Sequence, residues 1–168
     1  RPVIRGFDGD RVLIMQDGIR TGTLSSQSGD HGEPANVMSA ERFEIVRGPA
    51  TLLYGSNAVG GVVNTISRSS VLLDHRHQGL SGHVTGVGGS TNNLGGGGAG
   101  FEYGVNNWFL WGGGTSQRTG DYNTPEGTIS NSATRYTDTY AGFGRSTDKS
   151  FFSLNYGFYE GKYGVPFA

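Results

Sequence analysis

The fold is decided by residues 41–66, which read ERFEIVRGPATLLYGSNAVGGVVNTI. Apolar, β-favouring residues at 43–46 and 62–66 predict two short strands. Between them, Gly48 and Pro49 end the first strand, because proline cannot donate to a sheet ladder. Residues 50–54 predict one helical turn, which Gly55 closes. The stretch therefore predicts a strand, a corner, a helical turn and a second strand in close succession.

The residues before this stretch predict a hairpin and a helix start. Residues 11–15, RVLIM, have the composition of a short strand, Asp17-Gly18 is a hairpin turn signal, and residues 19–20 begin the return. A polar loop follows at 21–34. From Met38 we expect a helix with Ser39 as N-cap and Arg42 at the third helical position, where a complete capping box would have Glu or Gln. The part up to residue 68 thus predicts a compact α+β domain.

Beyond about residue 78 the pattern changes to strand, turn, strand. Ala99, Phe101, Tyr103 and Val105 share one face of a strand at 98–105, and Gly98, Gly100, Glu102 and Gly104 share the other. Residues 152–158 alternate in the same way. Weaker patterns at 79–89, 108–117 and 135–145 bring the expected number of strands to five.

The connections between these strands differ in length. Asn106-Asn107 and residues 147–149 predict tight turns, whereas residues 118–134 form a long polar loop. Outer-membrane barrels alternate short periplasmic turns with longer external loops, and the two tight turns and the long loop fit that alternation. The short connection at 90–93 fits it less well.

The aromatic residues and the glycines of this second part can each be interpreted in two ways. Trp108, Trp111, Tyr136, Phe151 and Tyr159 lie near predicted strand ends, where barrel aromatics meet lipid headgroups, but a soluble β-sandwich core also contains such residues. The 31 glycines far exceed the roughly one dozen that average usage gives. Those on the lumen side of a barrel would allow close approach to an enclosed domain, whereas residues 95–98 also resemble a low-complexity tract.

Composition and motifs exclude several functions. The net charge of −1 provides no basic surface for nucleic acid, and the absence of cysteine excludes disulfides and thiolate metal sites. Neither a phosphate-binding glycine loop nor a nucleophile elbow occurs. We therefore expect no catalytic residues, no enzyme activity and no permanently bound cofactor.

Residues 41–66 strongly resemble the plug signature of TonB-dependent outer-membrane receptors. Residues 1–20, RPVIRGFDGDRVLIMQDGIR, resemble the preceding plug segment. The resemblance implies a plug domain at 1–70, a linker at 71–78 and the first strands of a transmembrane β-barrel at 79–168. The expected fold class is thus an α+β plug followed by antiparallel barrel strands, as an incomplete barrel, because five strands cannot close a barrel of about 22.

The family resemblance also implies location, partners and contacts. It places the chain in the bacterial outer membrane, in contact with outer-membrane lipid, and makes the energy-transducing protein TonB a partner. Glu44 and Arg47 match positions associated with polar contacts between plug and barrel. The alternative is that the two residues form ion pairs on the surface of a plug strand and have no contact with the barrel.

The expected cargo is a metal ion or metal chelate, with zinc favoured. The chain resembles the zinc-uptake branch at residues 1–18, 30–31, 118–122 and 163–166. Asp30, His31 and Glu33 lie in one polar loop, and imidazole and carboxylate groups are good Zn²⁺ ligands, although a solvated Asp-His pair is common. His75 and His77 are interpreted first as linker residues and second as a metal relay; like His83, they lie at the junction of the two parts.

Other functions remain open from the sequence. A ferric-siderophore or cobalamin-type receptor is the alternative cargo class, and a signalling or adhesion barrel without transport is the alternative function. A soluble β-rich carbohydrate-binding module is a third possibility, against which the plug signature argues.

Overall fold

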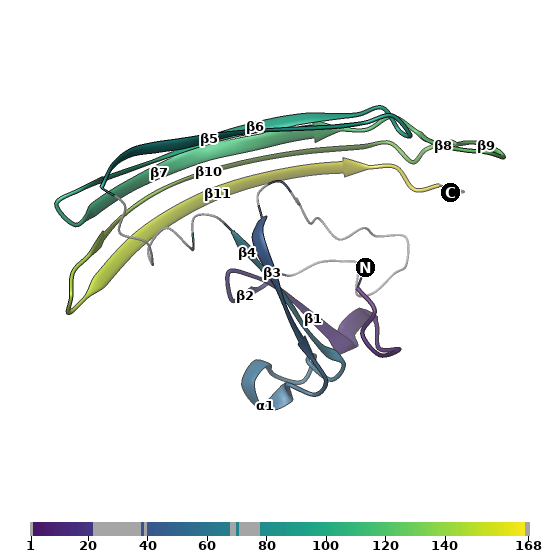
Figure 1. Ribbon diagram of the computed structural model, residues 1–168. Coiled ribbons are helices and arrows are strands. Elements are labelled where there is room, and N and C mark those ends of the chain that lie inside the picture. The colour runs from purple at the N-terminus through teal and green to yellow at the C-terminus, as the bar shows by residue number, and fades with distance from the viewer. Residues whose placement is uncertain (1, 22–37, 39, 68–69, 71–77, 167–168) are drawn as a thin grey trace. The chain divides into compact units, whose positions relative to one another are not determined.

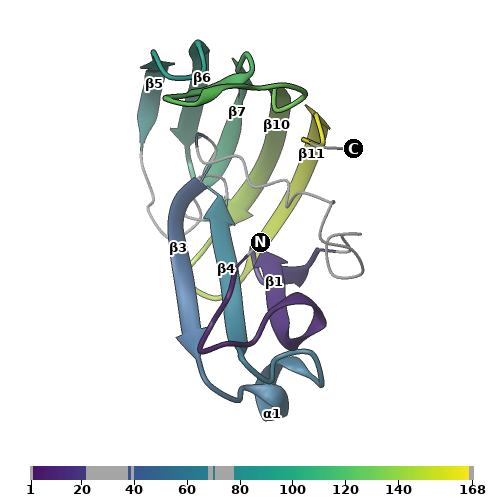
Figure 2. The same cartoon turned by 90° about the vertical axis from the view of Figure 1, so that its right-hand side faces the viewer.

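The computed structural model describes residues 2–21, 38, 40–67, 70 and 78–166. These residues fall into two compact units, one with strands β1 to β4 and one with strands β5 to β11. Figures 1 and 2 show the elements of both units. Among the described residues, no helix is both long enough and apolar enough to cross a membrane.

The first unit is built on a four-stranded mixed sheet. A 3-10 turn, η1 (Gly9–Arg11), leads into β1 (Val12–Gln16), and β2 (Ile19–Arg20), β3 (Ala40–Arg47), α1 (Thr51–Tyr54) and β4 (Gly61–Ser67) follow. The strand order is β2-β1-β4-β3, with β1 and β4 parallel and the other pairs antiparallel. Its buried core is a small cluster: Leu13, Met15, Ala50, Ala58 and Val62.

The predicted hairpin and helical turn are confirmed. Asp17 and Gly18 both have positive φ, 52° and 79°, as a two-residue type I′ hairpin turn requires. The turn α1 ends at Gly55, whose φ of 91° favours glycine. At the start of β4, Gly61 has a φ of 153°, and a Cβ there would collide with the carbonyl oxygen of Val46.

The predicted helix start at Met38 is wrong. The structure has the strand β3 from Ala40 onward, paired with β4 through a register shift between Ala40 and Arg42. Arg42 is therefore a strand residue opposite Ile66. The strand prevails because its backbone groups join the β4 ladder, whereas the proposed helix had only half a capping box.

The second unit contains a five-stranded antiparallel sheet. Its strands are β5 (Gly79–Gly89), β6 (Leu94–Val105), β7 (Trp108–Arg118), β10 (Thr134–Ser146) and β11 (Phe151–Tyr163), in the order β11-β10-β7-β6-β5. Each strand therefore pairs with the sheet strand that precedes it in the chain. All five predicted strands are confirmed, and the glycine tract at 95–98 lies inside β6 rather than in a low-complexity loop.

The connections agree with the predicted turns and add one element. Asn106 and Asn107 have positive φ, 49° and 69°, in the tight turn between β6 and β7. The long connection after β7 contains a small hairpin that the sequence analysis did not predict, β8 (Tyr122–Thr124) paired with β9 (Gly127–Ile129).

The described part of the chain is mostly sheet, with α1 as its single α-helix. The described fold is thus a four-stranded mixed sheet followed by a five-stranded antiparallel sheet that does not close into a barrel.

Candidate functional site

One face of the five-stranded sheet carries exposed apolar side chains. The registers align one row across all five strands: Leu80, Tyr103, Leu110, Phe143 and Leu154. Their exposed fractions range from 42% for Phe143 to 73% for Leu80. A continuous exposed apolar row is unusual for a protein surface in water and typical of the lipid-facing side of a membrane strand.

Neighbouring rows extend this surface along the strands, and we call the whole the apolar face. Phe143 and Phe152 pack edge to face with ring centroids 6.1 Å apart. At the end near the tight turns, the guanidinium of Arg145 lies 5.8 Å from the centre of the Trp108 ring. The apolar face comprises Leu80, Val84, Ala99, Phe101, Tyr103, Val105, Trp108, Leu110, Ala141, Phe143, Phe152, Leu154, Tyr156 and Phe158.

The opposite face of the sheet is built from glycine, polar and a few buried aromatic residues. Trp111 is 1% exposed and donates its indole N–H to Asn155 Oδ1 at 3.0 Å. Gly142 lies between them, and a Cβ there would be 2.6 Å from the indole ring. On the same face, the Thr115 hydroxyl donates to Asp138. Several glycines of this face thus make room for cross-strand side chains.

The predicted aromatic band at the strand ends needs correction. Trp108 lies on the apolar face, but Trp111, Tyr136 and Tyr159 point to the opposite face, where Tyr136 and Tyr159 stack at 6.2 Å. Nearness to a strand end does not decide which face a residue occupies, because that depends on whether its position in the strand is odd or even. Phe151 pairs with Ser146 and also lies on the opposite face.

A network of backbone and side-chain contacts orders the base of the long connection. Asp121 Oδ1 accepts the N–H groups of Ser132 and Ala133 at 2.9 and 3.0 Å. The side chain of Asn131 donates to the carbonyl of Val165 at 2.7 Å. These bonds hold the start and end of the connection together and tie it to the segment after β11. No signal in the sequence predicted this role, although Asp and Asn commonly bind nearby backbone groups in turns.

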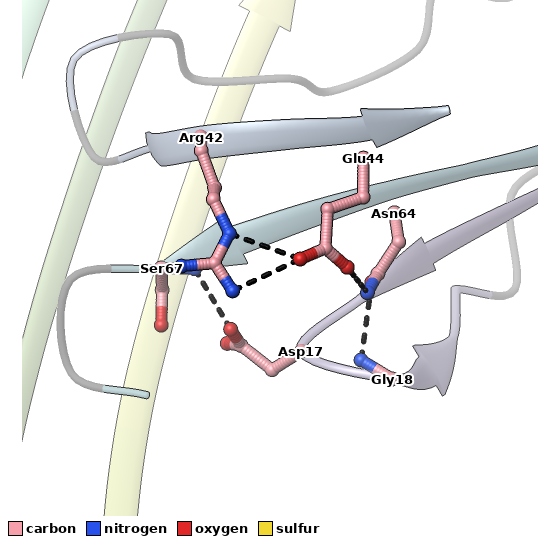
Figure 3. A network of polar contacts seen from close by, with 6 residues as sticks. All are labelled: Asp17, Gly18, Arg42, Glu44, Asn64 and Ser67. Atoms are coloured by element: carbon pink, nitrogen blue, oxygen red, sulfur yellow. Dashed lines mark hydrogen bonds and ion pairs between the residues drawn. The ribbon is translucent and has the colours of Figure 1, made fainter. Parts of the chain in front are cut away.

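In the first unit, a polar network joins β3, β4 and the β1–β2 turn (Figure 3). Glu44 accepts bonds from Arg42 at 2.9 Å and from Asn64 at 3.3 Å. Asn64 accepts the N–H of Gly18 at 3.1 Å, and Asp17 accepts the N–H of Ser67 at 2.7 Å. Because the side chains of Arg42 and Glu44 are 55% and 45% exposed, their ion pair contributes little stability, about 0–1 kcal/mol.

Of the two predicted contact residues, Glu44 is thus engaged within its own sheet. Arg47 ends β3 opposite Gly61 and, in the part of the chain that the structure describes, forms no ion pair. Their predicted contact with a barrel wall stays a prediction, because the two units are each described separately.

The predicted metal residues Asp30, His31 and Glu33 lie outside the described residues, as do His75 and His77. His83 lies in β5 on the face opposite the apolar one, beside Gly100. Within the described ranges, no group of three or more His, Asp or Glu side chains is arranged to hold a metal ion. The zinc prediction therefore stays a prediction.

The first unit corresponds to a known domain family. Residues 1–62 match the TonB-dependent Receptor Plug Domain. This plug region includes β1, β2, β3, α1 and the start of β4, and it contains all residues of the small core. The polar network lies partly beyond it, at Asn64 and Ser67.

Known proteins resemble the chain in sequence and in structure. A vitamin B12 transporter of Vibrio vulnificus is 39% identical over 67 residues, which are 40% of this chain and 11% of that protein. A hemin receptor of Yersinia enterocolitica is 42% identical over 79 residues, 45% of this chain and 11% of that protein. The solved structure of a copper transporter matches with a TM-score of 0.80 and 20% identity, over 98% of this chain and 25% of that one.

The copper transporter match extends the likeness in fold beyond the plug region to nearly the whole chain. The chain spans about a tenth of the length of the curated relatives that it matches. These proteins are named as receptors and transporters. An iron-regulated outer membrane virulence protein of Vibrio cholerae is 37% identical over 71 residues, 39% of this chain and 11% of that protein. The bacterial outer membrane is also the location of this chain.

Proposed function

We propose that this chain is the plug and the first wall strands of a TonB-dependent transporter that imports a metal ion or metal chelate across the outer membrane. The observation that carries the proposal is the exposed apolar face of five paired strands, directly following a plug region in the chain. Lipid would cover that face, whereas the glycine-rich polar face would line the lumen. Cargo capture would occur at the external end, and TonB would supply the pull that opens a path.

Exposed apolar residues of the plug region also support this proposal. Leu52 and Leu53 of α1 are 101% and 83% exposed, and Ile45 of β3 is 54% exposed. A plug enclosed by the full wall would bury such side chains, and burial would remove the unfavourable free energy of exposing them to water.

Membrane insertion can be tested with two neighbouring positions of β5. Val84 lies on the apolar face and Thr85 on the opposite one, and the chain contains no cysteine. In the full-length protein reconstituted in bilayers, a nitroxide label on Val84→Cys should collide with oxygen dissolved in lipid. The label on Thr85→Cys should collide less with oxygen and more with a water-soluble relaxation agent. Equal behaviour at both positions would contradict a lipid-facing sheet.

Transport can be tested separately by uptake in cells. Accumulation of the cargo should fall to the level of a receptor-deficient strain when TonB is deleted. In the TonB-deleted strain, which still carries the receptor, binding of cargo to the cell surface should persist. Uptake that is independent of TonB would exclude active transport, and binding without any uptake would favour a signalling or adhesion barrel.

For the cargo, we propose zinc bound by Asp30, His31 and Glu33 as the first candidate, on the chemistry of those side chains. Ferric siderophores and cobalamin are the alternative. The relatives carry vitamin B12, hemin or copper in their names, which favours a metal-bearing cargo in general. His31→Ala should abolish zinc uptake under metal limitation, and His83→Ala in β5 is the matched control. Unchanged zinc uptake in the first variant would leave a chelate as the cargo.

We further propose that Glu44 and Arg47 contact the barrel wall. Glu44→Gln and Arg47→Gln should each alter TonB-dependent uptake, whereas Arg42→Gln removes only the ion pair within β3. If Arg42→Gln has the same effect as Glu44→Gln, the role of Glu44 lies inside the plug.

A further inference from the structure

Three cations lie side by side at one end of the apolar face. Arg135 of β10 pairs in register with Arg118 of β7 on one side and with Lys162 of β11 on the other. Cross-strand partners point to the same face, with Cβ atoms about 4.5–5.5 Å apart. All three side chains are exposed. We call Arg118, Arg135 and Lys162 the cation row.

Like charges placed directly opposite one another destabilise a sheet, so the cation row needs an explanation. Among the described residues, neither Arg118 nor Arg135 forms an ion pair. Lys162 approaches Glu160 of its own strand at 3.8 Å, with both side chains largely exposed, 79% and 59%. Such an exposed pair leaves most of the positive charge of the row unbalanced.

The surroundings of the cation row suit a negatively charged group with an apolar part. The next row on the same face contains Ser116, Thr137 and Glu160. Ser116 Oγ and Thr137 Oγ1, which lie 3.2 Å apart, offer hydroxyl groups beside Arg118 and Arg135, and the Glu160 carboxylate lies on the Lys162 side. Beyond them begins the apolar face. Arg118 lies ten positions after Trp108 in β7, about 33 Å along the strand and about 25 Å of membrane thickness at the usual barrel tilt. The cation row thus lies at one border of the expected apolar band, on the side of the long connection.

We infer that the cation row binds the phosphate of a membrane lipid whose acyl chains lie over the apolar face. The guanidinium groups of Arg118 and Arg135 are suited to phosphate, because arginine binds phosphate oxygens with two parallel hydrogen bonds. A free phosphate would use the cations alone, whereas the acyl chains of a lipid also cover the apolar rows that begin beyond Thr137, which favours the lipid. The inference rests on the proposed function in one respect: the strands must stand in the membrane, with the long connection outside.

The test compares two arginines of the same strand and face. Arg135 belongs to the cation row, and Arg145 lies at the other end of β10 on the same face. Binding is measured by native mass spectrometry of the full-length protein in neutral detergent. The probe is lipid A carrying two phosphates, and the comparison probes are the same lipid without phosphate and inorganic phosphate.

We expect Arg135→Gln to weaken lipid A binding about fivefold, and removal of all three charges to weaken it roughly a hundredfold. Arg145→Gln should bind nearly as the parent protein does. Arg135→Lys keeps the charge but loses the two parallel bonds, so its affinity should lie between those of the parent and Arg135→Gln. Equal affinity of Arg135→Gln and the parent would overturn the inference, as would equal loss in Arg145→Gln. Phosphate-free lipid that binds as well as lipid A, or inorganic phosphate that binds as tightly, would also overturn it.

Thermal unfolding in neutral detergent without the lipid provides a fold check. Because the Arg135→Gln change removes like-charge repulsion, the melting temperature should stay the same or rise. A fall would show that Arg135 has a partner within the protein and would overturn the inference. A protein that passes the oxygen-collision test at Val84 but fails these binding tests would retain its proposed function and lose only the lipid site.

Discussion

Trp111 of β7 reaches across β10 to donate its indole N–H to Asn155 of β11, at 3.0 Å. The intervening residue of β10 is Gly142, which pairs in register with both of them. The indole can lie over β10 only because Gly142 has no side chain. One hydrogen bond thus connects two strands that share no ladder.

Gly142→Ala should therefore destabilise the sheet by about 1–3 kcal/mol, since the added methyl group would force the indole out of place. Asn155→Ala should cost about 1 kcal/mol through the lost hydrogen bond. Denaturant-induced unfolding in detergent measures both. Gly157→Ala is the control, because no atom lies within 4 Å of the added Cβ. Equal stability of Gly142→Ala and Gly157→Ala would refute this packing.

Asn64 is a second position at which a small substitution should change stability in a predictable direction. Its side chain accepts the N–H of Gly18 and donates to Glu44, so Asn64→Asp would keep the first bond and place a carboxylate beside Glu44. We expect a loss of roughly 1–2 kcal/mol near neutral pH, which shrinks in high salt because salt screens exposed charges. Thermal unfolding at two salt concentrations measures it. A salt-independent loss would contradict the electrostatic cause.

Asp121 should control the order of the long connection. Asp121→Ala would leave two backbone N–H groups, those of Ser132 and Ala133, without their acceptor. The connection should then be cut faster by protease, with the site located by mass spectrometry. Glu126→Ala is the matched control, because it removes a carboxylate at the exposed turn between β8 and β9. If both variants are cut at the rate of the parent, Asp121 does not hold the connection.

Gly61 should be the least replaceable glycine of the plug region. Gly61→Ala meets both a positive φ of 153° and the carbonyl oxygen of Val46, which joins β3 to β4. The free energy of unfolding should fall by about 2 kcal/mol or more relative to the parent, or the plug should fail to fold. Gly18→Ala, with positive φ but open space around its Cβ, should cost about 1 kcal/mol. A smaller effect at Gly61 than at Gly18 would be inconsistent with this account.

The sequence predicted those elements whose boundaries carry a local signal. Strand β5 was predicted from Gly79 to Gly89, as observed, and the hairpin at Asp17-Gly18 follows from turn chemistry alone. The start of β6 at Leu94 was missed, because Gly95 and the glycines after it show no alternation of apolar and polar side chains. The predicted helix start at Met38 failed because pairing with β4 outweighed a local capping signal.

The candidate sites were harder to predict, because they depend on register between distant segments. Gly18 and Asn64 are 46 residues apart in sequence, and nothing near either one indicates their contact. The same is true of Arg118 and Arg135, whose charges become neighbours only once β7 and β10 are aligned. The residue types indicated which kinds of contact the chain could make, but the strand pairing determined which side chains become neighbours.

The β8–β9 hairpin is inserted between two strands whose alignment does not depend on it. The ladder between β7 and β10 runs from Arg118 opposite Arg135 to Trp108 opposite Arg145, entirely outside the hairpin. Mutation, insertion or deletion at 122–129 can therefore alter what the hairpin tip touches without shifting any pair of that ladder. The sequence of this tip can thus diverge while the sheet beneath keeps its geometry.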